Sequence, residues 1–161
     1  VTLAKALRLM AQGKLPPEVP QDEKYATHVA KLKKTDGLID WSEPVLTIER
    51  KIRAYAPWPG CYTFLPARLR KKGNSGRVVI QRAEIVRKME DGWRDAAPGT
   101  VLKSVTARPK GTTGGTGPVV KCGDTALMLT ELKPEGSSAM DGGAFLRGRP
   151  LVAGEDRMVR E

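Results

Sequence analysis

Hydrophobic residues recur at helical spacing from the start of the chain. This first pattern uses Leu3, Leu7 and Met10 and stops at a glycine followed by two prolines, so we expect a helix over residues 1–12. Residues 14–36 show no strong periodicity and are rich in proline, lysine and glutamate at their start. This composition is typical of an extended linker that crosses a surface.

A second apolar stripe predicts another helix, and this one carries cations on its outer side. Ser42 is a suitable N-cap, Pro44 suits the first turn, and Ala56-Pro57 must end the helix. The buried face would be formed by Val45, Ile48, Ile52 and Tyr55. At 100° per residue, the cations Arg50, Lys51 and Arg53 point away from that face, so we expect them in solvent.

After Gly60 the pattern changes from helical to strand-like. Short runs bounded by turn residues predict strands at Cys61–Leu65, Arg77–Val86, Thr100–Val105, Val119–Cys122 and Ala126–Leu132. Several short strands at this spacing favour a small antiparallel barrel or sandwich. We expect a last helix, capped by Ser137 or Ser138, to run through Leu146, and residues 147–161 to be mostly loop.

The charge is positive and unevenly distributed. The chain holds 28 Lys and Arg against 18 Asp and Glu, which gives a net charge of +10. Residues 49–94 contain twelve cations and four anions, so this segment alone carries +8. Such a concentration is the electrostatic signature of a phosphate-backbone partner, and the alternative is a basic surface without a partner.

The same composition limits the other classes of protein. No apolar run approaches the length of about 18 residues that a membrane-spanning helix needs, and no signal peptide is visible. Cys61 and Cys122 lie in apolar strand contexts, so we expect buried free thiols and a reduced, cytoplasmic protein. The helical pattern starts at Val1, which favours a chain cut from a longer protein over a processed terminus.

Residue types that could carry catalysis do not form a defensible set. His28 is the single histidine and has no partner at metal-ligand or nucleophile spacing, so we expect neither a catalytic residue nor a metal site. The run from Gly111 to Gly117 lacks the Gly-Lys-Ser/Thr ending of a phosphate loop, and a hairpin loop is the better interpretation.

Two tryptophans bracket the basic helix and could serve packing or recognition. Trp41 precedes the helix, and Trp58 follows it within Pro57-Trp58-Pro59-Gly60. Exposed aromatic rings beside cations can stack on unpaired bases. Because tryptophan next to proline is more often a packing anchor, we predict that Trp41, Pro57, Trp58, Pro59 and Gly60 are structural anchors.

Ordered motifs along most of the chain resemble the linker and C-terminal domain of the methionyl-tRNA formyltransferase family. The motifs are Gln21-Asp22-Glu23, Ala26-Thr27, Lys31-Leu32, Ile39-Asp40-Trp41-Ser42, Ile52-Arg53-Ala54, Pro57-Trp58-Pro59-Gly60, Pro98-Gly99-Thr100-Val101-Leu102, Cys122-Gly123-Asp124, Ala126-Leu127, Leu132-Lys133-Pro134-Glu135-Gly136, Met140 and Phe145-Leu146-Arg147-Gly148. The resemblance implies a mainly β fold with flanking helices: an open Greek-key β-barrel, similar to an OB-fold, that follows a helical and extended linker.

The resemblance also implies a division of labour between domains. Residues 1–36 would be a linker arm and the end of an N-terminal formyltransferase domain, and residues 37–161 a tRNA-binding barrel. The N-terminal domain would hold the catalytic residues and the co-substrate 10-formyltetrahydrofolate, so we expect no cofactor in this segment. The alternative is a structural domain of a related sugar-nucleotide or folate formyltransferase or hydrolase.

The expected partners are initiator methionyl-tRNA and the N-terminal formyltransferase domain, and we expect a cytoplasmic monomer that serves translation initiation. Phosphate contacts should come from cations on the linker, on the second helix and on the hairpin after the first strand. The predicted tRNA-binding residues are Lys31, Lys33, Lys34, Arg50, Lys51, Arg53, Arg68, Arg70, Lys71 and Lys72.

Overall fold

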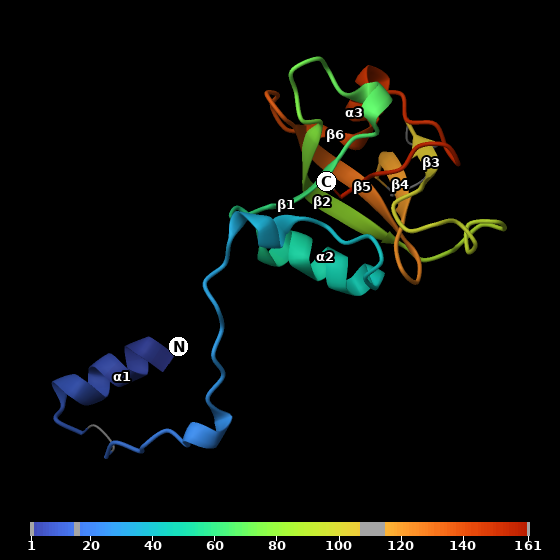
Figure 1. Ribbon diagram of the computed structural model, residues 1–161. Coiled ribbons are helices and arrows are strands. Elements are labelled where there is room, and N and C mark those ends of the chain that lie inside the picture. The colour runs from blue at the N-terminus through green and yellow to red at the C-terminus, as the bar shows by residue number, and fades with distance from the viewer. Residues whose placement is uncertain (1, 15–16, 107–114, 161) are drawn as a thin grey trace. The chain divides into compact units, whose positions relative to one another are not determined.

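The computed structural model describes residues 2–14, 17–106 and 115–160, and the chain divides into two units (Figure 1). The first unit, Val1–Lys31, contains helix α1 (Thr2–Ala11) and a short 3-10 helix (Glu23–Tyr25). The second unit comprises Leu32–Glu161. The domain boundary expected after residue 36 stays a prediction. Three apolar residues of α1 are exposed within the first unit: Leu3, Leu7 and Met10.

The second unit is built on one antiparallel sheet. Its strands are β1 (Cys61–Phe64), β2 (Arg77–Val86), β3 (Val101–Val105), β4 (Gly117–Lys121), β5 (Ala126–Pro134) and β6 (Met140–Asp141). The strand order is β1-β2-β5-β4-β3, and β6 pairs with β5. This arrangement confirms the expected mainly β architecture with helices beside the sheet. Among the strands in the described residues, the two-residue β6 has no predicted counterpart.

The last residues of the chain connect the two outer strands of the sheet. Val159 pairs with Phe64 of β1, and their backbone N–H groups donate to each other's carbonyls at 3.1 and 3.2 Å. Arg157 pairs with Thr100, directly before β3. Residues 147–161 were predicted as mostly loop, and these single bridges are too short to leave a periodic signal in the sequence.

Helix α2 (Val45–Ala54) packs against β2 and buries Val45, Ile48 and Ile52, as the apolar stripe predicted. The prediction that Ser42 caps this helix is wrong. The Ser42 hydroxyl donates to the Asp40 carboxylate at 2.6 Å, and the first free N–H of the helix, on Val45, donates to the Asp124 carboxylate at 2.7 Å. A residue far along the chain therefore caps α2.

Helix α3 (Gly142–Gly148) is shorter than predicted and has a different cap. The Asp141 carboxylate accepts a 2.9 Å hydrogen bond from the Ala144 N–H, whereas Ser137 and Ser138 do not cap the helix. The helix buries Phe145 and Leu146 against the sheet. Two further 3-10 helices complete the unit, at Lys34–Gly37 and Ala67–Leu69.

The core lies between the inner face of the sheet, α2 and α3. Alternate residues of β2 and β5 point inward, because successive side chains of a strand face opposite sides of the sheet. These inward side chains pack with side chains of α2, of α3 and of the chain end in one core cluster. Its members include Ile48, Ile52, Val78, Ile80, Leu127, Leu129, Leu132, Phe145 and Met158.

Candidate nucleic-acid interface

The three predicted cations of helix α2 differ in whether they are paired with a carboxylate. Lys51 Nζ donates to both carboxylate oxygens of Glu43, at 2.6 and 2.7 Å. Arg53 binds Glu49 through Nε at 2.6 Å and through a terminal nitrogen at 3.1 Å. Arg50 is exposed and has no ion pair with any described residue. On this helix, Arg50 is therefore the side chain best able to contact a phosphate.

The segment between β1 and β2 contains two arginines that organise the protein itself. Arg68 Nε donates to the Asp156 carboxylate at 2.8 Å, and its terminal nitrogen donates to the Pro150 carbonyl at 3.1 Å. The hydrogen bond to Asp156 raises the pKa of Arg68. Arg70 Nε donates to the Leu65 carbonyl at 2.8 Å. Both side chains hold the loop in place, and Lys71 and Lys72 between β1 and β2 remain exposed.

The predicted linker cations fall in different units. Lys31 belongs to the first unit, and Lys33 and Lys34 begin the second. All three are exposed. The backbone N–H of Lys33 donates to the Asp36 carboxylate at 2.7 Å, which fixes the start of the 3-10 helix that contains Lys34.

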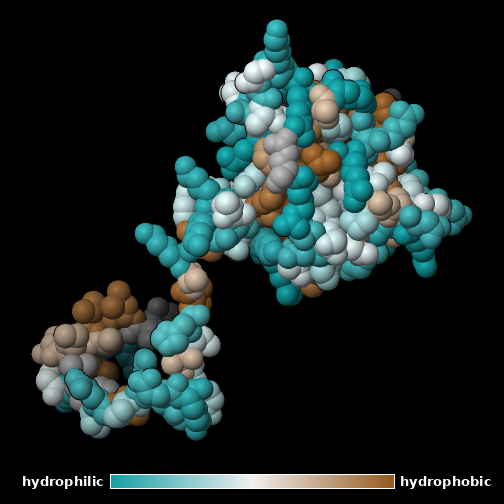
Figure 2. Space-filling view, in the orientation of Figure 1, coloured by the Kyte–Doolittle hydropathy of each residue, from teal (hydrophilic) through white to brown (hydrophobic). Residues whose placement is uncertain are grey.

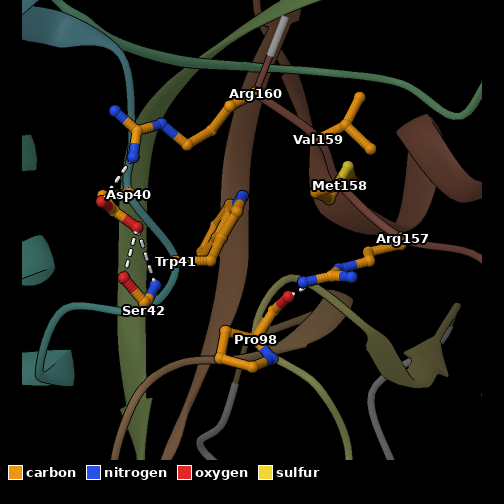
Figure 3. Close-up of a pocket in the computed structure, with 8 residues that line it drawn as sticks. All are labelled: Asp40, Trp41, Ser42, Pro98, Arg157, Met158, Val159 and Arg160. Carbon is orange, nitrogen blue, oxygen red and sulfur yellow. Dashed lines mark hydrogen bonds and ion pairs between the residues drawn. The ribbon is translucent and has the colours of Figure 1, made fainter.

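A cavity beside Trp41 brings together two arginines that the sequence pattern did not identify (Figure 3). It has a volume of about 520 Å³, and Arg157 and Arg160 lie on two sides of it. Arg160 is paired with Asp40, and Arg157 Nε donates to the Pro98 carbonyl at 2.7 Å. Hydrogen bonds from Ser42, with a contribution from Arg160, hold the pKa of Asp40 below its ordinary value. The positions of Arg157 and Arg160 follow from the β-bridges at the end of the chain, and these bridges leave no motif in the sequence.

The two tryptophans of the opening motifs differ in their surroundings. Trp41 is only 3% exposed, and its indole Nε1 donates to Thr63 Oγ1 at 3.1 Å. Trp58 is 53% exposed, so burial does not support its predicted role as a structural anchor. It lies in a turn with cis peptide bonds before Pro57 and Pro59, and its ring does not belong to the core cluster.

The surface of the second unit is mainly hydrophilic on the face seen in Figure 2. Several exposed cations of the second unit have no ion pair with a described residue: Arg50, Lys71, Lys72, Arg87, Lys88 and Arg94. All six belong to the segment 49–94, whose positive charge was evident from the sequence. The segment's charge is therefore only partly neutralised by local carboxylates.

The side chains considered for catalysis are two buried thiols and one exposed imidazole. Burial raises the pKa of the Cys61 thiol to about 11 and that of Cys122 to about 12, and both are free. His28 is exposed in the first unit. No group of three potential metal ligands occurs within 2–14, 17–106 and 115–160, and no helix in these ranges could span a membrane. Most of the predicted 111–117 loop lies outside the described residues.

Comparisons with known proteins agree with the motifs. Residues 31–150 match the family model described as formyl transferase, C-terminal domain. The methionyl-tRNA formyltransferase of Gluconacetobacter diazotrophicus is 35% identical over 136 residues, covering 84% of this chain and 37% of that protein. The corresponding protein of Chloroflexus aurantiacus is 39% identical over 146 residues, covering 91% and 40%. The chain thus spans about two fifths of the length of these relatives.

A solved structure shares the fold at low sequence identity. The crystal structure of HypX from Aquifex aeolicus in complex with tetrahydrofolic acid aligns with a TM-score of 0.57 at 20% identity. The alignment covers 99% of this chain and 26% of that protein. This likeness concerns the fold alone, whereas the family model matches most of the second unit. The chain belongs to the family of formyl transferase C-terminal domains.

Proposed function

We propose that this chain is the tRNA-binding C-terminal domain of a methionyl-tRNA formyltransferase. It would hold initiator methionyl-tRNA while an N-terminal domain outside this chain transfers the formyl group from 10-formyltetrahydrofolate. The family membership and the names of the relatives support this function. The alternative, a structural domain of a sugar-nucleotide or folate formyltransferase or hydrolase, is not favoured by these relatives.

The observation that carries the proposal is the set of exposed cations that lack a carboxylate partner among the described residues. Arg50, Lys71 and Lys72 belong to the predicted tRNA contacts, and Arg87, Lys88 and Arg94 extend the set. A domain that only braces a neighbour gains nothing from unpaired charge, whereas a polyanion gains counterion release at each neutralised phosphate. Arg68 and Arg70, which bind protein groups, are assigned to folding instead.

We further propose that the sheet is an open Greek-key barrel similar to an OB-fold. Three consecutive strands, β3, β4 and β5, lie side by side, and β2 lies beside β5, which is the order of a Greek key. The bridges of Val159 and Arg157 to the outer strands support closure of the sheet. A cytoplasmic monomer is the form in which we expect this domain to act.

A salt titration of tRNA binding tests the function. We expect the affinity for initiator tRNA to fall steeply with salt and to exceed the affinity for elongator tRNA. Arg50→Gln should reduce the slope of log K against log salt by about one, because one phosphate contact is lost. Lys103→Gln removes the same charge from a lysine paired with Glu90 and serves as the matched control. A flat salt profile would exclude the proposed function.

A further inference from the structure

A hollow lies beside the turn that carries the exposed Trp58. Its volume is about 310 Å³, and Pro57, Pro59 and Gly60 form one side of it. The other side comes from Arg77, Val79 and Gln81 of β2 and from the end of β5 and the turn after it, residues 133–136. The hollow is separate from the Trp41 cavity, with which it shares no lining residue.

The pleat of the sheet explains why these side chains gather on one outer surface. Val78 and Ile80 are buried in the core, so Arg77, Val79 and Gln81 between and beside them face outward. Val79 pairs directly with Lys133 of β5 and with Tyr62 of β1. Directly paired residues share a face, so Lys133 and Tyr62 point to the same side as Val79.

The charge in the hollow is positive and only partly satisfied. The Arg77 guanidinium carbon lies 3.9 Å from the centre of the Tyr62 ring, and its buried Nε has no hydrogen-bond partner among the described residues. Lys133 is exposed and forms no ion pair within the part of the chain that the structure describes. One carboxylate, that of Glu135, also lines the hollow, and it accepts hydrogen bonds from the Ser75 N–H at 3.1 Å and hydroxyl at 2.7 Å.

Trp58 adds an exposed aromatic ring in the turn beside this hollow, although the ring itself is not among the lining residues. Its two neighbours in the chain, Pro57 and Pro59, line the hollow, and the side chain itself is 53% exposed. Indole rings stack on any unpaired base, and cations beside the ring bind the phosphate that the base carries. In a duplex, bases are already stacked on each other and cannot use such a ring.

We propose that Trp58 and the adjoining hollow form a site for an unpaired nucleotide of RNA. The base stacks on the Trp58 indole, and Arg77 and Lys133 contact the phosphate. The inference rests on the proposed function, because it assigns one single-stranded contact within a larger tRNA surface. Two cations, Arg77 and Lys133, against the one carboxylate of Glu135 leave the lining positive, which favours this occupant over another protein domain, for which apolar contact alone would suffice.

Binding of a short single-stranded oligouridylate to the 161-residue chain tests the site. We expect binding to quench tryptophan fluorescence, and we expect Trp58→Leu to abolish the quenching although Trp41 and Trp93 remain. The variant should bind about 5- to 150-fold more weakly, which corresponds to the loss of one base–aromatic stack. Its salt slope should stay unchanged, because no charge is removed. An RNA duplex of the same strand length should quench little.

Two further variants separate stacking from charge and from folding. Lys133→Gln should reduce the salt slope by about one and leave the quenching in place. Leu46→Ala removes a different exposed apolar side chain, 45% exposed on α2, and should change neither quantity. Melting temperatures of all variants report whether any loss of binding comes from unfolding.

The outcomes distinguish this site from the general tRNA surface. If Trp58→Leu leaves both oligouridylate affinity and quenching unchanged, or if the duplex quenches as strongly as the single strand, the site is not one for an unpaired nucleotide. Salt-dependent tRNA binding would persist in either case, so only this inference would fail. Absence of salt-dependent tRNA binding in the unaltered chain would overturn the proposed function together with the site.

Discussion

The carboxylate of Asp124 accepts a hydrogen bond of 2.7 Å from the backbone N–H of Val45, 79 residues earlier in the chain. Asp124 lies in the turn between β4 and β5, and the neighbouring Gly123 N–H donates to the Glu43 carbonyl at 3.0 Å. A side chain at Gly123 would collide with the Ser42 carbonyl. The start of the basic helix α2 is therefore positioned by a turn of the sheet. The negative charge of Asp124 also interacts favourably with the positive N-terminal end of the helix dipole.

Replacing Asp124 by alanine should destabilise the protein. The Val45 N–H would lose its acceptor, and loss of an N-terminal cap costs about 0.5–2 kcal/mol. Urea denaturation should show this decrease in the free energy of unfolding. Asp124→Asn keeps an acceptor oxygen and should lose less. An Asp124→Ala variant as stable as the unaltered chain would show that the cap contributes nothing.

The same contact predicts a dependence on pH. The hydrogen bond from Val45 is the main cause that lowers the pKa of Asp124 in the folded protein. A lowered folded-state pKa means that this stabilisation is fully present above about pH 4, the ordinary pKa of aspartate, and is lost as the pH falls through the folded-state value. The difference in unfolding free energy between the unaltered chain and Asp124→Asn should therefore shrink below pH 4. A difference that is constant at all pH values would contradict this.

The sequence predicted the elements of the fold well where the pattern is local. The Arg77–Val86 strand appears with the predicted bounds, and the stripe of α2 faces the core, because side-chain periodicity directly reports one buried face. The caps were predicted wrongly. Ser42 is adjacent to the helix in the sequence, but Asp124 reaches the same N–H through the tertiary fold. Long-range caps of this kind cannot be read from local sequence.

The sequence shows where the positive charge is concentrated, but not which of the cations are paired with carboxylates. Composition located the basic segment, yet it could not show that Arg68 is bound to Asp156 or that Arg50 has no partner among the described residues. Pairing depends on which distant carboxylate the fold brings near. The proline-flanked motif predicts a structural anchor at Trp58, whereas the fold leaves its ring more than half exposed.

The two tryptophans should respond oppositely to substitution. Trp41 is buried and hydrogen-bonded to Thr63, so Trp41→Ala should lower the free energy of unfolding by about 3–5 kcal/mol. Trp58→Ala should cost less than about 1 kcal/mol, because its ring is more than half exposed. Thermal melting of the two variants measures the difference. Equal destabilisation by both would show that Trp58 also anchors the fold.

Arg68 and Lys71 lie three residues apart but should have separate effects. Arg68→Gln removes the bidentate partner of Asp156, whose side chain is only 4% exposed, so the melting temperature should fall. Lys71→Gln removes an exposed charge without a described ion pair, so tRNA affinity should fall while the melting temperature stays the same. Melting curves and salt titrations of the same two variants check both expectations. A stable Arg68→Gln protein with weakened tRNA binding would assign Arg68 to the RNA surface instead.

The two buried cysteines should make the folded protein resistant to thiol reagents and sensitive to alkali. Burial raises their pKa values to about 11 and about 12, so at pH 8 roughly one Cys61 thiol in a thousand is ionised, and thiolates are the reactive form. We expect modification at pH 8 to be slow in the folded chain and rapid in urea.

The alkaline effect follows from the same raised pKa values. The unfolded thiols lose their protons near pH 8.5, whereas the folded ones keep them to about pH 11. Their contribution to stability is therefore fully present below pH 8.5 and is lost progressively as the pH rises toward the folded-state values. The Cys61→Ala and Cys122→Ala double variant should show a flatter decline of unfolding free energy between pH 8.5 and 11 than the unaltered chain. Identical declines, or rapid labelling of the folded protein at pH 8, would show that the thiols are accessible and ionise normally.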